Sequence, residues 1–222
     1  MVSKYQKHID VAREEIIKKE FGTTQQYLWV HEVIFEDDQP KVERIDDETY
    51  KGNIIAIYFP IKNVNFYLEI HVLKNPISVD SVWIESGHKI YLTATSEMLT
   101  YEELVEWLNI EPLEWFSKWD SRIHLKSKYT FSEVTYNPIK NQAYSLNAKL
   151  DKLLNELEKA KDAIRILKEK SDYIGISVCK YQYIWNWMMG DNLSANEIKR
   201  LADLNLAIDF DIYIQGIPFW NQ

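Results

Sequence analysis

The segment from Ser194 to Gln215 constrains the fold of this chain most strongly, because it encodes a helix and then a strand without interruption. Ser194 is followed three residues later by Glu197, which predicts a capping box in which hydroxyl and carboxylate satisfy backbone N–H groups at a helix start. Apolar residues recur at helical spacing up to Leu204, and polar and apolar residues alternate from Ala207 onward. We therefore predict a capped helix followed directly by a strand.

A second capped segment occurs earlier in the chain. Thr100 and Glu103 have the same capping-box spacing, and a strand-like run from Ile90 to Thr95 precedes them. Beyond Gly87, predicted strands and helices alternate. The strands are expected at 88–95, 124–131, 172–181 and 207–215, and the helices at 100–109, 142–157, 161–168 and 194–204. The recurrence of a strand with a capped helix predicts a ferredoxin-like α/β sandwich.

The first part of the chain has a different pattern, a helix followed by several strands. Apolar residues at helical spacing predict the helix, and runs rich in Ile, Val, Tyr and Phe between turn residues predict the strands. The helix is expected at 5–19 and the strands at 26–35, 41–45, 53–59, 65–73 and 79–85. We therefore predict an α+β protein in two parts, an N-terminal helix and antiparallel sheet at 1–86 and a C-terminal domain at 87–222.

The charge balance bears on possible partners. The 222 residues carry a formal net charge of −8, which argues against nucleic-acid binding because that depends on clusters of Lys and Arg. An acidic surface suits a basic protein partner, and it also serves solubility alone. Both interpretations stay open at this point.

The chain carries no sign of export. Residues 1–20 are charged and helix-like without an apolar signal region, and no segment approaches the roughly 18 apolar residues of a membrane span. A single cysteine, Cys179, excludes an intrachain disulfide. We expect a cytoplasmic protein that does not bind membranes, and its oligomeric state is left open.

Three segments carry a family resemblance. They are Ser96–Pro112 (SEMLTYEELVEWLNIEP), Lys118–Arg122 (KWDSR) and Ser194–Tyr213 (SANEIKRLADLNLAIDFDIY). In the order and the residues of these segments, the chain from about His88 to Gly216 resembles the bacterial domain of unknown function 4279 family. The family usually carries glycine in the short charged loop, where this chain has Trp119.

The resemblance implies an α+β fold, and it implies no activity and no catalytic residues. The motif positions that it marks, with an expected structural role, are Lys118, Asp120, Arg122, Asp209, Asp211 and Tyr213. Families of this kind resemble the variable genes found beside bacterial toxins, many of which encode immunity proteins. The resemblance therefore implies a protein that binds and neutralises a basic toxin domain.

Acidic and aromatic residues are the candidates for contacting such a partner. We predict the contacts at Asp37, Asp38, Asp46, Asp47, Glu48, Tyr183, Trp185 and Trp187. Strand alternation offers a structural alternative, in which the aromatic run from Tyr181 is a core stripe, and Asp209 and Asp211 are the solvent face of a half-buried sheet or buried acids paired with a base.

No pattern of catalytic residues is visible. The chain lacks a nucleophile motif, its five histidines have no metal-ligand spacing, and its six glycines are isolated rather than grouped in a phosphate-binding loop. We predict a non-enzymatic protein without metal or cofactor. Two alternatives are a regulatory domain with a small-molecule pocket at 185–189, and a hydrolase that uses two of Asp46, Asp47, Asp209 and Asp211.

Overall fold

A computed structural model of the chain describes residues 4–50, 52–122, 127–137, 143, 145–184 and 190–218. The chain forms two compact units. The first unit draws on residues within 1–88, 180–189 and 212–222, and the second on residues within 89–179 and 190–211. Helices and antiparallel sheets in these units confirm the predicted α+β class.

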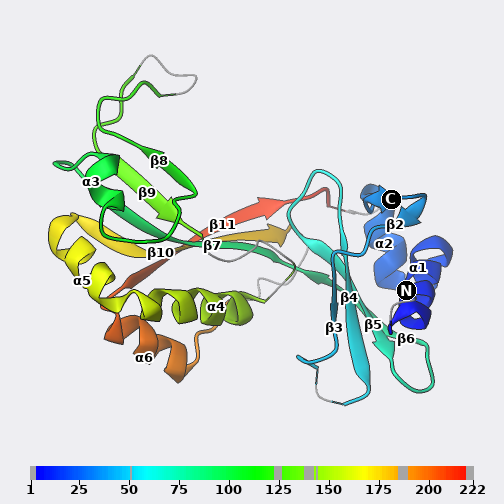
Figure 1. Cartoon of the computed structure of the whole chain (residues 1–222). Helices are drawn as coiled ribbons and strands as arrows, with labels where there is room; N and C mark the ends of the chain where they lie inside the picture. Colours follow the sequence, from blue (N-terminus) through cyan, green and yellow to red (C-terminus); the bar gives the residue numbers. More distant parts are fainter. Residues whose placement is uncertain are drawn as a thin grey trace. The chain divides into compact units, whose positions relative to one another are not determined.

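The first unit packs two helices against one face of a four-stranded antiparallel sheet (Figure 1). Its elements are α1 (Gln6–Lys18), α2 (Gly22–Val30), the two-stranded pair β1 (Phe35–Glu36) and β2 (Gln39–Pro40), and the sheet strands β3 (Arg44–Asp46), β4 (Ile54–Pro60), β5 (Tyr67–Leu73) and β6 (Val79–Glu85). The sheet order is β3-β4-β5-β6, a meander. Alternate residues of β5, Leu68, Ile70 and Val72, are fully buried beneath the helices, as strand geometry requires.

The strand predicted at 26–35 is wrong, because the first half of that segment belongs to α2, which ends at Val30. Thr24 and Tyr27, three residues apart, are buried on one side of the helix, whereas Trp29 is 79% exposed. Burial at helical spacing outweighs the weak strand preference of the aromatic and branched residues in this segment.

The second unit covers one face of a mixed five-stranded sheet with helices (Figure 1). Its elements are β7 (Gly87–Ser96), α3 (Tyr101–Val105), β8 (Glu114–Phe116), β9 (Ser132–Tyr136), α4 (Leu146–Lys159), α5 (Lys161–Lys170), β10 (Tyr173–Tyr183), α6 (Ala195–Asp203) and β11 (Ala207–Gln215). The ends of β7, β10 and β11 belong to the first unit. The sheet order is β11-β10-β7-β9-β8, with β9 antiparallel to β7 and β8.

Both predicted capping boxes are present. The Thr100 hydroxyl accepts from the Glu103 N–H and the Ser194 hydroxyl from the Glu197 N–H, while each glutamate carboxylate accepts from the N–H of its cap residue. From β7 to β10 the chain follows a β-α-β-β-α-β succession, apart from the extra helix α5. The finer ferredoxin-like assignment stays a prediction.

Of the strand predicted at 124–131, residues 124–126 lie outside the described residues, and residues 127–131 form only an isolated bridge at Lys128. The strand in this region is β9, which starts at Ser132, and the short strand β8 before it was not predicted. Tyr129, whose aromatic character favours a strand, instead stacks on Phe116 with ring centroids 3.7 Å apart, and Phe131 meets the same ring edge-on at 5.5 Å. Both side chains therefore pack on β8 from the segment that precedes β9.

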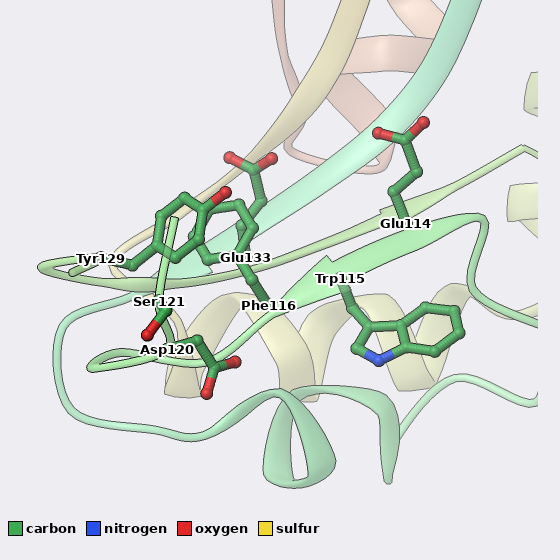
Figure 2. Close-up of a pocket in the computed structure, with 7 residues that line it drawn as sticks. All are labelled: Glu114, Trp115, Phe116, Asp120, Ser121, Tyr129 and Glu133. Carbon is green, nitrogen blue, oxygen red and sulfur yellow. The ribbon is translucent and has the colours of Figure 1, made fainter. Parts of the chain in front are cut away.

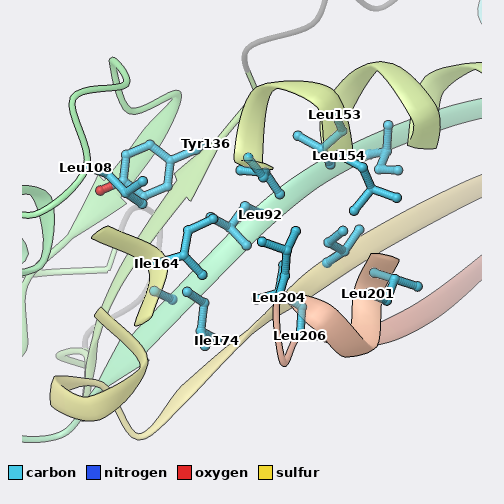
Figure 3. Packing of buried hydrophobic residues seen from close by; sticks show 14 of the residues in the cluster. Leu92, Leu108, Tyr136, Leu153, Leu154, Ile164, Ile174, Leu201, Leu204 and Leu206 are labelled. Atoms are coloured by element: carbon cyan, nitrogen blue, oxygen red, sulfur yellow. The ribbon is translucent and has the colours of Figure 1, made fainter. Parts of the chain in front are cut away.

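The core of the second unit fixes which face of the sheet is covered. Leucines of α4, including Leu153 and Leu154, meet Leu92 of β7 and Ile174 of β10 (Figure 3). Leu201 of α6 closes one end of the same cluster. No helix in the described part of the chain has the length and hydropathy that a membrane crossing requires.

Candidate functional site

The sheet of the second unit has an open face, opposite the helices. Ile90, Leu92 and Ala94 of β7 point into the core, so the alternation of the strand turns Tyr91 and Thr93 to the other side. Residues paired across antiparallel strands share a face, which extends this assignment to β8 and β9. We call this side, which the described helices do not cover, the open face; it comprises Tyr91, Thr93, Glu114, Phe116, Glu133, Thr135, Ser177, Cys179, Asp209 and Asp211. Thr93, Thr135 and Cys179 are nevertheless buried among their neighbours.

Polar contacts cross the centre of the open face. Thr93 Oγ1 lies 3.1 Å from Ser177 Oγ, and the Tyr91 hydroxyl lies 3.5 Å from Cys179 Sγ. Burial, and then the neighbouring thiol, raise the pKa of Tyr91 above the ordinary tyrosine value. The centre of the face therefore carries hydroxyl and thiol groups, and the carboxylates lie toward its edges.

A pocket of about 830 Å³ lies where β8 and β9 meet the loop between them (Figure 2). Its lining combines three carboxylates with three aromatic rings, from Glu114, Trp115, Phe116, Asp120, Ser121, Tyr129 and Glu133. Trp115 projects to the other side of β8 from its neighbours and stacks on Tyr101 at 5.7 Å. The remaining acidic and aromatic side chains make this an acidic pocket with an aromatic wall.

The surroundings of Glu133 shift its pKa. It is half-buried, and burial followed by the charge of Glu114 raises its pKa above the ordinary glutamate value. Glu114 and Glu133 are brought together by the antiparallel pairing of β8 with β9, in which Thr135 lies opposite Glu114. Neither carboxylate forms an ion pair with a residue that the structure describes.

The raised pKa of Glu133 predicts a stability effect with a definite sign. Ionising Glu133 costs folding free energy above the pKa of the unfolded glutamate, so Glu133→Gln is expected to raise the Tm at pH 7 by a few degrees. The gain should disappear in acid, where both side chains are neutral. Thermal melts over a pH series measure this, with Glu156→Gln on α4 as a control that shows no such gain. A lower Tm for Glu133→Gln at pH 7 would contradict the assignment.

The aromatic wall already holds a cation of this chain. Tyr129 stacks on Phe116 with an interplanar angle of 16°, and the Arg122 guanidinium carbon lies 5.0 Å from the Tyr129 ring centroid. A cation at this distance is attracted by the ring quadrupole. The wall therefore shows a binding mode that a basic side chain of another molecule could use.

The KWDSR loop positions this wall. The Asp120 carboxylate accepts from the Ser117 N–H at 2.7 Å, and the Lys118 N–H donates to the Ser132 hydroxyl at 2.9 Å. Trp119, where the family usually has glycine, has φ +77° and so adopts the left-handed conformation that glycine adopts most easily. The structure thus brings together Lys118, Asp120 and Arg122 in one turn beside the pocket.

The acidic residues predicted to bind a partner lie in the first unit and differ in exposure. Asp37 and Asp38 are exposed, with φ of +49° and +57°, in the tight turn between β1 and β2. Asp46 is only 3% exposed, whereas Glu48 is exposed and Asp47 bonds to the Tyr5 hydroxyl. Their partner-binding role stays a prediction, and Asp46 has in addition a structural role.

Of the three aromatic residues predicted to contact a partner, only Tyr183 lies among the described residues. Tyr183 is 1% exposed, in a ring cluster with Tyr27, His31 and Phe66, and its hydroxyl donates to the Ile217 carbonyl at 2.9 Å. This placement matches the core-stripe alternative. Trp185 and Trp187, together with the alternative pocket at 185–189, lie outside the described residues.

The motif residues of the last strand are exposed. Asp209 accepts from the Tyr173 hydroxyl, and Tyr213 stacks on Tyr181 at 5.3 Å. Asp211 lies between them on the same side of β11. These acids line the solvent side of the strand, so they do not form the enclosed carboxylate pair that a hydrolase would need.

A second network of polar side chains joins β5 and β6 in the sheet of the first unit. His71 Nε2 lies 2.8 Å from Glu69 Oε1, and His71 Nδ1 lies 3.1 Å from Ser81 Oγ. The Ser81 hydroxyl also lies 3.1 Å from both Asp80 Oδ2 and Trp83 Nε1. Through His71, the Ser81 hydroxyl links β6 to β5. Among the described residues, no three His, Cys, Asp or Glu side chains converge as a metal site would require.

Sequence reasoning missed the pocket itself. Glu114, Tyr129 and Glu133 were not singled out, and the only local signal was the alternation of polar and apolar residues from Ser132 to Tyr136. Residues 86–215 match the family model described as "Domain of unknown function (DUF4279)". No curated protein and no solved structure matches the chain.

Proposed function

Since the chain belongs to the DUF4279 family, a domain of unknown function, we propose its role from its own geometry: a non-enzymatic binding protein that holds a basic segment of a partner protein on its open face. The observation that carries this proposal is the pair Glu114 and Glu133. Two carboxylates share a pocket without a counter-ion from the described residues, and burial already disfavours the charge of one of them.

A basic side chain of the partner would relieve the repulsion between the two carboxylates. An ammonium or guanidinium group between Glu114 and Glu133 would replace carboxylate repulsion with attraction, and the half-buried setting would strengthen the interaction relative to bulk water. The aromatic wall of Phe116 and Tyr129 adds apolar area beside the charges. A charged pair flanked by buried aromatic anchors is the composition that dominates binding energy at protein interfaces.

The partner that we propose is a toxin domain with a basic surface, and the protein would act as its cytoplasmic immunity protein. The net charge of −8 supports this, because opposite charges accelerate association and suppress wrong partners. The family resemblance supports it by association with toxin loci. The same charge disfavours nucleic acid as the partner.

Co-expression with a toxin encoded beside this gene tests the proposal. Wild-type protein should restore growth, and the double substitution Glu114→Gln and Glu133→Gln should weaken the purified complex at least about tenfold, since close charge pairs at interfaces contribute about 1.5 kcal/mol or more. Calorimetric titration of the purified pair measures this loss.

The matched control is Glu156→Gln with Glu169→Gln, which changes the net charge equally on exposed positions of α4 and α5. It should bind as the wild type does, apart from a small change in salt dependence. If the protein neither restores growth nor forms a complex with the toxin, the immunity role is rejected. If the two double variants weaken the complex equally, the pocket is not where the partner binds.

A second candidate is a small cationic ligand in the same pocket, because its volume of about 830 Å³ falls in the range of ligand sites. A ligand that binds only the folded state raises the Tm by mass action. A thermal-shift screen with cationic metabolites therefore separates the two candidates, since a dedicated immunity protein should show no shift.

A further inference from the structure

The last strand, β11, lies at one edge of the five-stranded sheet and has few of the features that usually protect an edge strand. It spans nine residues, carries neither lysine nor proline, and is exposed along most of its length. Ile212 is 59% and Ile214 54% exposed. Long, exposed, apolar edge strands are templates for pairing with another strand, and proteins normally protect them with charges, bulges or proline.

The backbone of β11 shows which of its groups are available. Contacts between Tyr173 and Asp209 and between Tyr181 and Tyr213 advance along both strands together, so β11 runs parallel to β10. The carbonyl of Gln215 accepts from the Ile184 N–H, so odd-numbered residues of β11 direct their backbone groups toward β10. The N–H and C=O groups of the even-numbered residues, which are Ile208, Phe210, Ile212 and Ile214, therefore point to the free edge.

The side chains of β11 define what could pair there. Asp209 and Asp211 lie on the open face, while Phe210, Ile212 and Ile214 lie on the other face. An added strand with Lys or Arg on the first side and Val or Ile on the second would form opposite-charge and apolar cross-strand pairs. A second copy that pairs through its own β11 fits less well, because the charged residues of that strand are the two acids Asp209 and Asp211.

We propose that β11 binds an extended segment of the partner, with alternating basic and branched apolar residues, as a sixth strand of the sheet. This inference rests on the proposed function and specifies how the basic partner is held. Main-chain hydrogen bonds to the even-numbered residues provide affinity, and alternation provides specificity. The basic side chains of the added strand face the same side of the sheet as the acidic pocket, but β10, β7 and β9 separate β11 from β8, so the two contacts would involve different parts of the partner.

The test uses a fluorescent peptide in which four lysines alternate with three valines, titrated into the full-length protein and followed by anisotropy. Ile212→Pro removes one outward N–H without touching the ladder to β10, and proline is tolerated at such edge positions. We expect Ile212→Pro to weaken binding at least about tenfold. Ile212→Thr, the control, keeps the N–H and strand preference and should lose much less.

Hydrogen exchange of the backbone amides separates strand addition from a purely electrostatic contact, because only strand addition forms hydrogen bonds to these amides. On peptide binding, the amides of Phe210, Ile212 and Ile214 should exchange more slowly, while those of Asp211 and Tyr213, already directed to β10, should not. The same peptide with its central valine replaced by proline should lose this protection.

Three outcomes would overturn the strand-addition proposal. Wild-type affinity of Ile212→Pro, with weakened binding by the Glu114→Gln and Glu133→Gln double variant, rejects strand addition and leaves the proposed function standing. A dimer in light scattering that Ile212→Pro abolishes would assign the edge to a second copy. Protection confined to β8 and β9 would place the peptide in the pocket alone. Failure of the proposed function is distinct, because it appears as absent toxin rescue and absent toxin binding.

Discussion

Replacing Gly87 with alanine is expected to lower the free energy of unfolding by about 3 kcal/mol or more. Gly87 begins β7 and is buried against the backbone of Asn65. A Cβ atom at this position would overlap the Asn65 carbonyl oxygen and lie 2.8 Å from its carbonyl carbon. Both are backbone atoms, so no side-chain rotation relieves the overlap. Urea denaturation followed by circular dichroism measures the loss.

Gly22→Ala is the matched control for this substitution. Gly22 is the first residue of α2, and a Cβ atom there would have no neighbour within 4 Å. Alanine should be neutral or should stabilise the protein by up to about 1 kcal/mol, because it restricts the unfolded chain. Equal destabilisation by the two substitutions would mean that the contact between Gly87 and Asn65 is not the cause.

Asp46→Ala is expected to cost about 3 kcal/mol or more, as losing one partner of a buried ion pair typically does. The Asp46 carboxylate accepts from Arg44 Nη2 at 2.6 Å and from the N–H groups of Glu48 and Thr49 at 3.0 Å each. Burial opposes its ionisation, but the hydrogen bonds of Thr49 and Glu48, with the charge of Arg44, outweigh burial and lower the pKa of Asp46. Thermal and urea unfolding measure the effect.

The lowered pKa fixes the pH dependence of this contribution. A carboxyl group whose folded pKa is depressed stabilises the protein above its unfolded pKa, and the stabilisation is lost as pH falls through the folded pKa. The stability gap between wild type and Asp46→Ala should therefore narrow in strong acid. Glu48→Ala, exposed and two residues away, should stay within about 0.5 kcal/mol of wild type. A similar loss in both variants would contradict the structural role of Asp46.

The parts of the fold that could be predicted are those with local causes. The capping boxes at Thr100 and Ser194 formed as expected, because each needs only a hydroxyl and a carboxylate three residues apart. The strand β11 also formed where it was predicted and its acids are exposed, but Phe210, Ile212 and Ile214 on its other face are exposed as well. In contrast, the helix α2 could not be recognised, because burial of Thr24 and Tyr27 against the sheet, rather than intrinsic propensity, selects it.

The candidate site was beyond sequence reasoning for a different reason. Glu114 and Glu133 are distant in sequence and meet only because β8 and β9 pair in one register, which turns both to the open face. A shift of one residue would turn Glu133 into the core. Acidic character by itself also suggested a partner-binding residue where the structure has an internal contact. Asp46 belongs to the acidic segment at 46–48, but its buried carboxylate pairs with Arg44.

The sequence by itself determined the α+β class, the capped helices, the alternating last strand and the acidic balance, since these depend on residues that are neighbours along the chain or on composition. Only the tertiary structure decided which carboxylates share a pocket, which acid is structural and which strand is left as an edge. Those features depend on strand order and register, which are set by the burial of apolar faces across the whole sheet.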